Sequence, residues 1–242
     1  MDEKKKVLRY YDTGKLGVIA TAVFFVVLIF GLSMNLFVAK TPYVVTGHVA
    51  GDAGLSVGLV LVGVVIHELL HGLGAVLFGK CKKGDVKYGI NLKEGIAYCH
   101  AKKPLSGKAY CGMLVLPIIM TGIIPFAICV ATGGLMEIAA FALLIAGGTG
   151  DVIMLVGVLK NKDANREIID HETAPAYYAL MTDEELASLG LEETTEESEK
   201  QTIEKCKSGE GTKLGIKIAL IAVFVALTVL GLFLLALFMK VI

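Results

Sequence analysis

Long runs of apolar residues, separated by shorter polar segments, dominate the pattern of the chain. An α-helix needs about 20 residues to cross the hydrocarbon core of a membrane. Five runs are long enough, and they cover residues 17–39, 54–79, 112–131, 135–159 and 214–238. Thr132, Gly133 and Gly134 lie between the third and fourth runs and predict a tight turn, so these two helices should pack antiparallel. The pattern predicts an all-α multi-pass membrane protein with about five transmembrane helices.

The polar segment 80–111 shows a different pattern. Residues 86–92 and 95–101 alternate weakly between polar and apolar and are rich in Val, Ile and Tyr, and Lys93-Glu94-Gly95 between them is typical of a turn. We expect a small cytoplasmic β-hairpin in this loop, with a solvated basic connector as the alternative. The predicted organisation is a cytoplasmic head (1–16), a four-span core (17–159) that includes this loop, an acidic cytoplasmic segment (160–213) and a C-terminal transmembrane helix (214–242). In the acidic segment, Thr182 before three acidic residues predicts the start of a helix.

Composition and charge distribution place the chain in a membrane. Hydrophobic residues make up 55% of the chain, which is high for a soluble domain. The formal net charge is zero, which argues against nucleic acid as a partner. Basic residues concentrate in the head and in the loop 80–111. Because cytoplasmic loops carry the excess of Lys and Arg, we expect a cell-membrane protein with a cytoplasmic N-terminus and an external C-terminus.

The second apolar run contains the sequence His67-Glu68-Leu69-Leu70-His71. Residues four apart share one face of a helix, so His67 and His71 can bind the same metal ion. The pentapeptide is typical of a zinc site in which the glutamate, here Glu68, serves as general base. Ionisable groups are expensive in a membrane and indicate function there. A chance occurrence of the motif without metal is the alternative.

Asp151 is the predicted third ligand. Among the acidic residues, Glu68 and Asp151 are the two that fall deep within predicted spans. His71 and Asp151 each lie eight residues before the cytoplasmic end of their span, roughly 12 Å in depth at about 1.5 Å per residue. They can therefore lie level, and two histidines with one carboxylate leave the fourth zinc position for water. A carboxylate used in helix packing or an ion pathway is the alternative for Asp151.

The chain resembles the site-2-protease-like intramembrane zinc metalloproteases and, more closely, a group of prokaryotic zincin membrane peptidases. The resemblance rests on the His67–His71 motif followed by Gly72, on residues 98–105 with Pro117 beyond them, and on Gly150-Asp151; it covers about 60–181. It implies that residues 86–101 bind an extended substrate segment by strand addition. Within them, Ile96, Tyr98 and His100 are candidate substrate contacts, and His100 is alternatively a fourth ligand or a surface histidine.

These observations favour an intramembrane zinc metalloprotease. It would cleave transmembrane or membrane-associated protein substrates near the cytoplasmic face of the lipid bilayer. The expected cofactor is Zn²⁺, bound by His67, His71 and Asp151, with Glu68 as general base. Two other functions remain open from the sequence. One is a non-catalytic scaffold in which zinc joins spans two and four, and the other is a cation transporter that uses the glycine-rich break beside Asp151.

Overall fold

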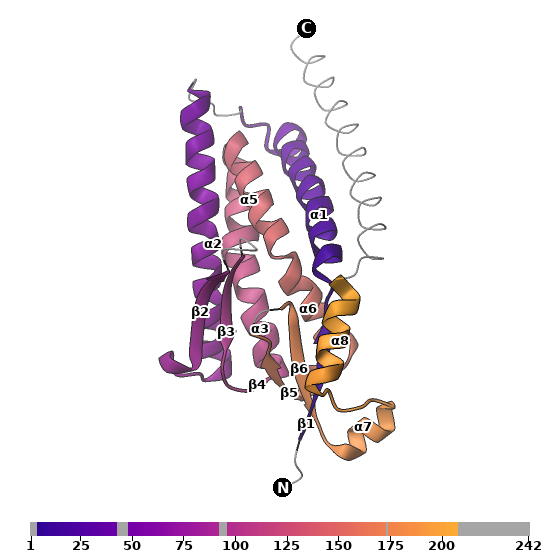
Figure 1. The fold of residues 1–242 in the computed structure, drawn as a ribbon. Helices are drawn as coiled ribbons and strands as arrows, with labels where there is room; N and C mark the ends of the chain where they lie inside the picture. Colours follow the sequence, from indigo (N-terminus) through magenta and orange to yellow (C-terminus); the bar gives the residue numbers. More distant parts are fainter. Residues whose placement is uncertain (1–3, 43–47, 92–95, 173, 208–242) are drawn as a thin grey trace.

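The computed structural model describes residues 4–42, 48–91, 96–172 and 174–207. Long helices run side by side, and the strands gather at one end of the bundle, where the described chain also begins (Figure 1). We call this the sheet end. The predicted span 214–238 and the turn residues 92–95 lie outside the described residues.

Four of the described helical stretches are long and apolar enough to cross a membrane. By length and composition they indicate a membrane protein, as the apolar runs predict. The first is α1 (Thr13–Met34) with the π-helical segment η1 (Asn35–Ala39), and the second is α2 (Val49–Gly79). The third comprises α3 (Gly107–Pro117), the π-helical segment η3 (Ile118–Ile123) and α4 (Ile124–Thr132). The fourth comprises α5 (Leu135–Gly147) and α6 (Thr149–Lys160).

The third and fourth stretches meet at the predicted glycine turn. Gly133 ends α4 with φ of 81°, in the left-handed region that glycine adopts without a steric penalty. The fourth stretch is interrupted at Gly148, the residue that ends α5 and precedes α6. An added Cβ at Gly148 would lie 3.4 Å from Ile118 and 3.6 Å from the ring of His67, whereas Gly147 and Gly150 face open space. These distances are ordinary van der Waals contacts, so a methyl group would fit at all three positions and the helix approach near the predicted site does not require glycine there.

The strands expected in the loop 80–111 are present. A short 3₁₀ turn, η2 (Lys83–Asp85), leads into β2 (Val86–Asn91), which pairs antiparallel with β3 (Ile96–Ala101). The register places Gly89 opposite Tyr98 and Lys87 opposite His100. Along α2, an added Cβ at Gly72 would overlap the Tyr88 hydroxyl, so this glycine lets β2 lie directly against the helix.

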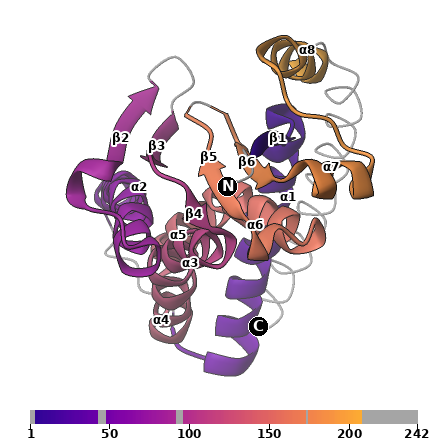
Figure 2. The same cartoon turned by 90° about the horizontal axis from the view of Figure 1, so that it is seen from below.

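The sequence analysis missed a second sheet. Strands β1 (Lys5–Tyr10), β6 (Ala176–Met181), β5 (Glu167–Asp170) and β4 (Leu105–Ser106) form an antiparallel sheet in that spatial order. The segments predicted as a separate head and a separate acidic segment thus join in one sheet. Figure 2 looks along the helices and shows this sheet beside β2 and β3. Short strands with little alternation give a weak local signal, which explains the omission.

A buried charge cluster holds the sheet to the end of α6. Asp163, in the 3₁₀ turn η4 (Asp163–Asn165), has no exposed surface. Its carboxylate accepts hydrogen bonds from Arg9 at 3.3 Å, Arg166 at 2.8 Å and the Tyr177 hydroxyl at 3.1 Å. A buried carboxylate is tolerated when charged donors satisfy it in this way. The cluster connects β1, η4 and β6.

Two short helices follow the sheet. Helix α7 (Asp183–Leu189) begins at Thr182, which forms a reciprocal capping box with Glu185, so the predicted helix start is confirmed. Helix α8 (Glu196–Lys207) packs beside β1. The connecting residue Thr194 accepts a hydrogen bond from the Leu8 N–H on its hydroxyl and donates its own N–H to the Lys6 carbonyl.

Candidate metal centre

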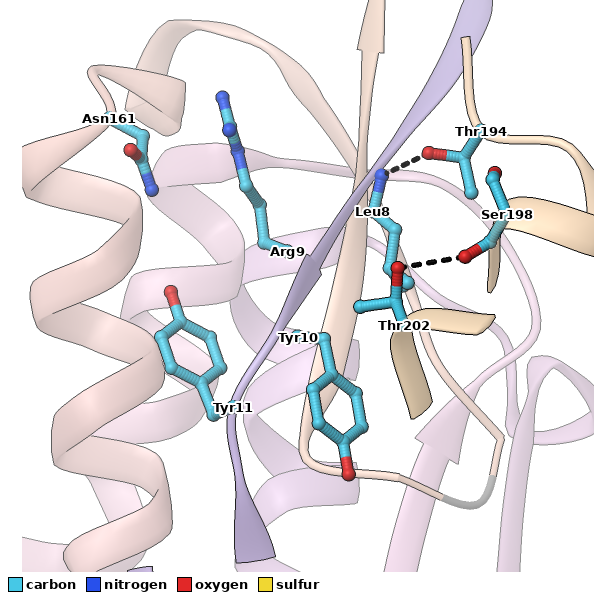
Figure 3. A pocket seen from close by; sticks show the side chains of 8 residues that line it. All are labelled: Leu8, Arg9, Tyr10, Tyr11, Asn161, Thr194, Ser198 and Thr202. Carbon is cyan, nitrogen blue, oxygen red and sulfur yellow. Dashed lines mark hydrogen bonds between the residues drawn. The ribbon is translucent and has the colours of Figure 1, made fainter. Parts of the chain in front are cut away.

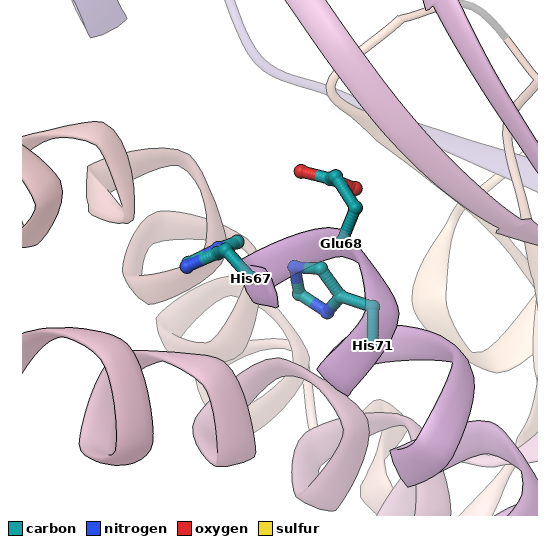
Figure 4. A group of neighbouring side chains, drawn as sticks. All are labelled: His67, Glu68 and His71. Carbon is teal, nitrogen blue, oxygen red and sulfur yellow. The ribbon is translucent and has the colours of Figure 1, made fainter. Parts of the chain in front are cut away.

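The two motif histidines project from one face of α2 (Figure 4). Their ring centroids lie 5.0 Å apart. The His71 side chain is 8% exposed and that of His67 is 12% exposed. Spacing of four residues in a continuous helix produces this pairing without any tertiary contact.

Asp151 approaches both imidazoles from the first turn of α6. Its Oδ2 lies 3.0 Å from Nε2 of His67, and its Oδ1 lies 3.4 Å from Nε2 of His71. Helix α6 begins directly after Gly148, so Asp151 falls in its first turn. The structure thus brings together the three residues that the sequence analysis named as ligands.

The other nitrogen of each imidazole has its own partner. Nδ1 of His71 lies 3.1 Å from the carbonyl oxygen of Met113, and a carbonyl only accepts, so this nitrogen carries a proton. Nδ1 of His67 lies 3.1 Å from the Thr121 hydroxyl, which donates its proton to the Pro117 carbonyl at 2.8 Å. The hydroxyl therefore accepts from His67. In both histidines Nε2 is therefore the nitrogen that is left to bind a metal ion or to carry a second proton.

Three electron-pair donors consequently face one another. With both Nδ1 atoms protonated, each Nε2 faces the carboxylate of Asp151, and without a second proton on a ring all three groups are electron-pair donors. Such a set needs a cation among its members, which is either a proton on an imidazole or a metal ion. Two imidazoles and one carboxylate are a donor set that suits Zn²⁺, and hydrogen bonds to Nδ1 are the usual support for metal-binding histidines. The residues present therefore fit zinc.

Glu68 lies beside this group. Donor atoms of His67, Glu68 and His71 all fall within 4.8 Å of one another, so these three residues also form a possible metal site. The carboxylate of Glu68 faces the backbone N–H of Cys99 in β3. Asp151 contacts both Nε2 atoms directly, so its carboxylate is also placed to share a metal ion with the two histidines.

The three candidate substrate contacts have different surroundings. Tyr98 places its ring over Gly89 of β2, where an added Cβ would meet it. Ile96 pairs with Asn91 at the beginning of β3. His100 is 5% exposed, so the alternative of a surface histidine is wrong. Its neighbour is Asp170, whose Oδ2 lies 3.6 Å from Nδ1 of His100.

The pKa of the Cys99 thiol reflects the electrostatic environment of the same region. Burial, and then the negative charges of Glu68 and Asp170, raise the pKa of Cys99 to about 12. Negative charge therefore accumulates around this partly buried thiol, and negative charge favours the binding of a cation.

Sequence reasoning missed Thr121 and the Met113 carbonyl. Pro117 was a visible signal of an irregular helix near Thr121, because proline lacks an N–H and disturbs the hydrogen bonds of the helix. The helix does pass into the π-helical segment η3 directly after Pro117, and that segment carries Thr121. Such π-helical turns are frequent at functional sites. The carbonyl of Met113 has no sequence signal.

A separate cavity lies away from these residues. It has a volume of about 380 Å³ and lies where the end of β1 meets α8 and the end of α6 (Figure 3). Its lining consists of Leu8, Arg9, Tyr10, Tyr11, Asn161, Thr194, Ser198 and Thr202. None of the metal-centre residues lines it, so it offers no substrate pocket for that centre.

Comparison with known proteins gives one match. No curated protein and no solved structure matches the chain. Residues 60–165 match the model of a family described as "Putative zincin peptidase". The matched range covers less than half of the chain and includes both motif histidines, Glu68 and Asp151. Over this range the chain is similar to zincin peptidases, which indicates a zinc metallopeptidase.

Proposed function

We propose that the protein is an intramembrane zinc metalloprotease that cleaves membrane-protein substrates. The observation that carries the proposal is the convergence of Nε2 of His67, Nε2 of His71 and the carboxylate of Asp151, with Glu68 beside them. All four residues lie in helical stretches that are long and apolar enough to cross a membrane. Bond cleavage would then occur within the membrane rather than in a soluble domain.

In this proposal His67, His71 and Asp151 hold the zinc ion, and each Nδ1–H donor keeps its imidazole in the binding orientation. When bound, zinc polarises the scissile carbonyl and lowers the pKa of water toward neutrality. Glu68 takes a proton from the attacking water and delivers it to the leaving amine. Fixed imidazoles and a nearby carboxylate reduce the reorganisation needed in the transition state.

Strand β3 is suited to bind the substrate. Its ladder partner among the described strands is β2, and the Cys99 N–H points away from β2 toward Glu68. An extended peptide can add to this unpaired edge through backbone hydrogen bonds. A substrate segment bound there would pass the catalytic base. Helical peptides shield their carbonyls, so the substrate helix must unwind before it pairs.

We further propose that the sheet end lies in the cytoplasm. The supporting feature is the charge distribution, because the head and the loop 80–111 carry most of the basic residues outside the acidic segment. The site would then lie near the cytoplasmic face, from which water can reach Glu68. The C-terminus would lie outside if 214–238 spans the membrane.

The test combines metal content with proteolysis. Purified full-length protein should hold about one zinc ion per chain, and Asp151→Ala should lose most of it. Glu137→Ala removes another acidic residue of the same helical stretch, in the first turn of α5, and serves as the matched control that keeps zinc. Glu68→Gln should keep zinc and lose cleavage of a single-span test substrate in proteoliposomes. Cleavage at the wild-type rate by Glu68→Gln refutes the mechanism.

The same geometry supports one second candidate. Asp151 on α6 contacts two histidines on α2, so a bound zinc would join these helices as a structural staple. A staple predicts that Asp151→Ala lowers the unfolding temperature while Glu68→Gln leaves every function intact. The proteolysis assay with Glu68→Gln separates the two candidates.

A further inference from the structure

The cavity beside β1 takes no part in the proposed metal chemistry. Its volume of about 380 Å³ lies in the range of about 300–1,000 Å³ that is usual for small-molecule sites. Strand β1 forms one edge of its sheet, and the cavity lies along it, between the end of α6 and helix α8 (Figure 3). Its walls come from three parts of the chain, residues 8–11, 161 and 194–202, which only the fold brings together.

The lining of the cavity is rich in hydrogen-bond donors. Seven of its eight described residues carry a side-chain N–H or O–H group, Leu8 being the exception, and none of the eight is acidic. Glu199 of α8 does not line the cavity, and its carboxylate is engaged by His171 at 3.1 Å and by the Tyr178 hydroxyl at 2.8 Å. A lining with many donors, one cation and no carboxylate suits an oxygen-rich anion such as a phosphate.

Two groups of the lining are available to donate to a ligand. The Nε of Arg9 donates to Asp163 at 3.3 Å, and the two terminal nitrogens of Arg9 have no partner among the described residues. The Thr194 hydroxyl accepts from the Leu8 N–H at 2.8 Å, and no described residue accepts its own proton. The Arg9 side chain is 18% exposed, so a ligand can reach a guanidinium that bulk water does not fully surround. Its two terminal nitrogens can hold two oxygens of one phosphate.

Two other hydroxyls of the lining are left to accept. Ser198 donates its proton to the Thr195 carbonyl at 2.9 Å, and Thr202 donates to the Ser198 carbonyl at 2.7 Å. Their oxygens retain lone pairs that can accept hydrogen bonds from hydroxyl groups of a ligand. Arg9 extends toward the end of α6, whereas Ser198 and Thr202 lie on the opposite side of β1 (Figure 3). This separation of donors and acceptors matches a phosphate that carries a polyol.

Basic residues surround the end of α6 beside the cavity. Asp163 accepts from Arg166 as well as from Arg9, so its carboxylate offsets only part of the charge of Arg9. Lys160 and Lys162 are exposed, and neither forms an ion pair within the described part of the chain. An anion that approaches the cavity therefore meets positive charge.

The cavity lies at the level where two helices leave the predicted membrane. Tyr11 stands three residues before Gly14, where the first apolar helical stretch begins, and Asn161 directly follows Lys160, where the fourth ends. Lipid headgroups occupy this layer, just outside the hydrocarbon core. A phospholipid is therefore the anion that this position makes most accessible.

We propose that this cavity binds the phosphate headgroup of an anionic phospholipid. The terminal nitrogens of Arg9 and the Thr194 hydroxyl donate to the phosphate oxygens, and Ser198 and Thr202 accept from hydroxyl groups of a glycerol headgroup. The acyl chains remain in the bilayer. A soluble phosphate ester carries the same chemical group, so the experiment includes one. The inference does not depend on the peptidase function.

The experiment measures lipid binding to the detergent-purified full-length protein by native mass spectrometry. The probes are phosphatidylglycerol, phosphatidylcholine, whose headgroup is zwitterionic and has no hydroxyl group, and glycerol 3-phosphate as the soluble ester. The wild type should bind phosphatidylglycerol about 10-fold more tightly than phosphatidylcholine, because hydrogen bonds to a charged group are lost with the latter. The preference should saturate at a single lipid per chain, and glycerol 3-phosphate should compete only weakly because it has no acyl chains.

Two variants should remove the preference for phosphatidylglycerol. Arg9→Gln removes the cation of the lining. Because Arg9 also holds Asp163, the second variant, Thr202→Phe, fills the cavity from α8 and leaves that buried cluster intact. Gln201→Phe adds the same bulk at the neighbouring exposed position of α8, outside the lining, and is the matched control that keeps the preference. Lys87→Gln, in the basic loop 80–111, should also keep it and controls for general attraction of anionic lipid.

Equal binding of the two lipids by the wild type overturns the inference. A preference that survives in Thr202→Phe, or that is lost equally in Gln201→Phe or in Lys87→Gln, overturns it as well, since the lipid would then bind elsewhere. Tight binding of glycerol 3-phosphate without any preference between the lipids overturns the membrane source and identifies a site for soluble phosphate esters.

Discussion

The hydrogen bond between Thr121 and His67 allows a direct test of the metal centre. Thr121 is 6% exposed, so water cannot readily take the place of its hydroxyl. The substitution Thr121→Val keeps the branched shape but removes the acceptor for Nδ1 of His67 and the donor to the Pro117 carbonyl. The ring of His67 is then free to rotate, and its Nε2 loses the fixed direction toward Asp151.

The expected effect is a loss of zinc affinity without loss of the ligands. Removing a hydrogen-bond partner of a metal-binding histidine lowers affinity by about 10- to 100-fold. This corresponds to about 1.4 to 2.8 kcal/mol at about 1.4 kcal/mol per factor of ten. Part of this arises because a buried N–H is left unsatisfied. Thr121→Ser retains the hydroxyl and is the matched control, with an expected affinity close to that of the wild type.

The assay is a competition titration in detergent between the apo-protein and a fluorescent zinc chelator of known affinity. Both variants must first show the wild-type unfolding temperature to within a few degrees. Thr121→Val that binds zinc within twofold of the wild type refutes the reasoning, because the Thr121 contact would then not orient a metal ligand. Equal weakening in Thr121→Ser refutes it as well, since packing and not the hydroxyl would be responsible.

Three further predictions concern the surroundings of the site. Asp163→Ala removes the buried carboxylate shared by two partly buried arginines, of which Arg9 then has no described carboxylate partner and Arg166 keeps Glu185. It should lower the free energy of unfolding by about 3 kcal/mol, measured by denaturant titration in micelles; a loss below about 1 kcal/mol contradicts this. Gly72→Ala places a Cβ where the Tyr88 hydroxyl lies and should destabilise the protein by about 1–3 kcal/mol. Adding Tyr88→Phe should recover part of that loss in the same unfolding measurement. Burial, together with the negative charges of Glu68 and Asp170, raises the pKa of Cys99 to about 12, so its thiol should resist iodoacetamide at pH 8 in metal-free protein. Glu68→Gln removes one of these charges and should speed alkylation, as followed by peptide mass spectrometry. Rapid alkylation of Cys99 in the wild type contradicts this.

The sequence was sufficient for features that depend on local spacing. Apolar runs of membrane length predicted the four described helical stretches, because a helix in hydrocarbon must satisfy its own backbone groups. The spacing of His67 and His71 placed both imidazoles on one helical face. The glycines at 133 and 134 predicted the turn between α4 and α5, since a left-handed residue is available there at little steric cost.

Tertiary structure decided which distant groups meet. Asp151 lies 84 positions from His67, and its contact with both imidazoles depends on how α6 packs against α2. Thr121, the Met113 carbonyl and the His100–Asp170 pair arise in the same way. The four-stranded sheet joins the first strand of the chain to residues 176–181, and neither segment has a strong strand pattern by itself. Helix formation follows from neighbouring residues, whereas these contacts depend on the packing of whole elements, which a local pattern does not encode.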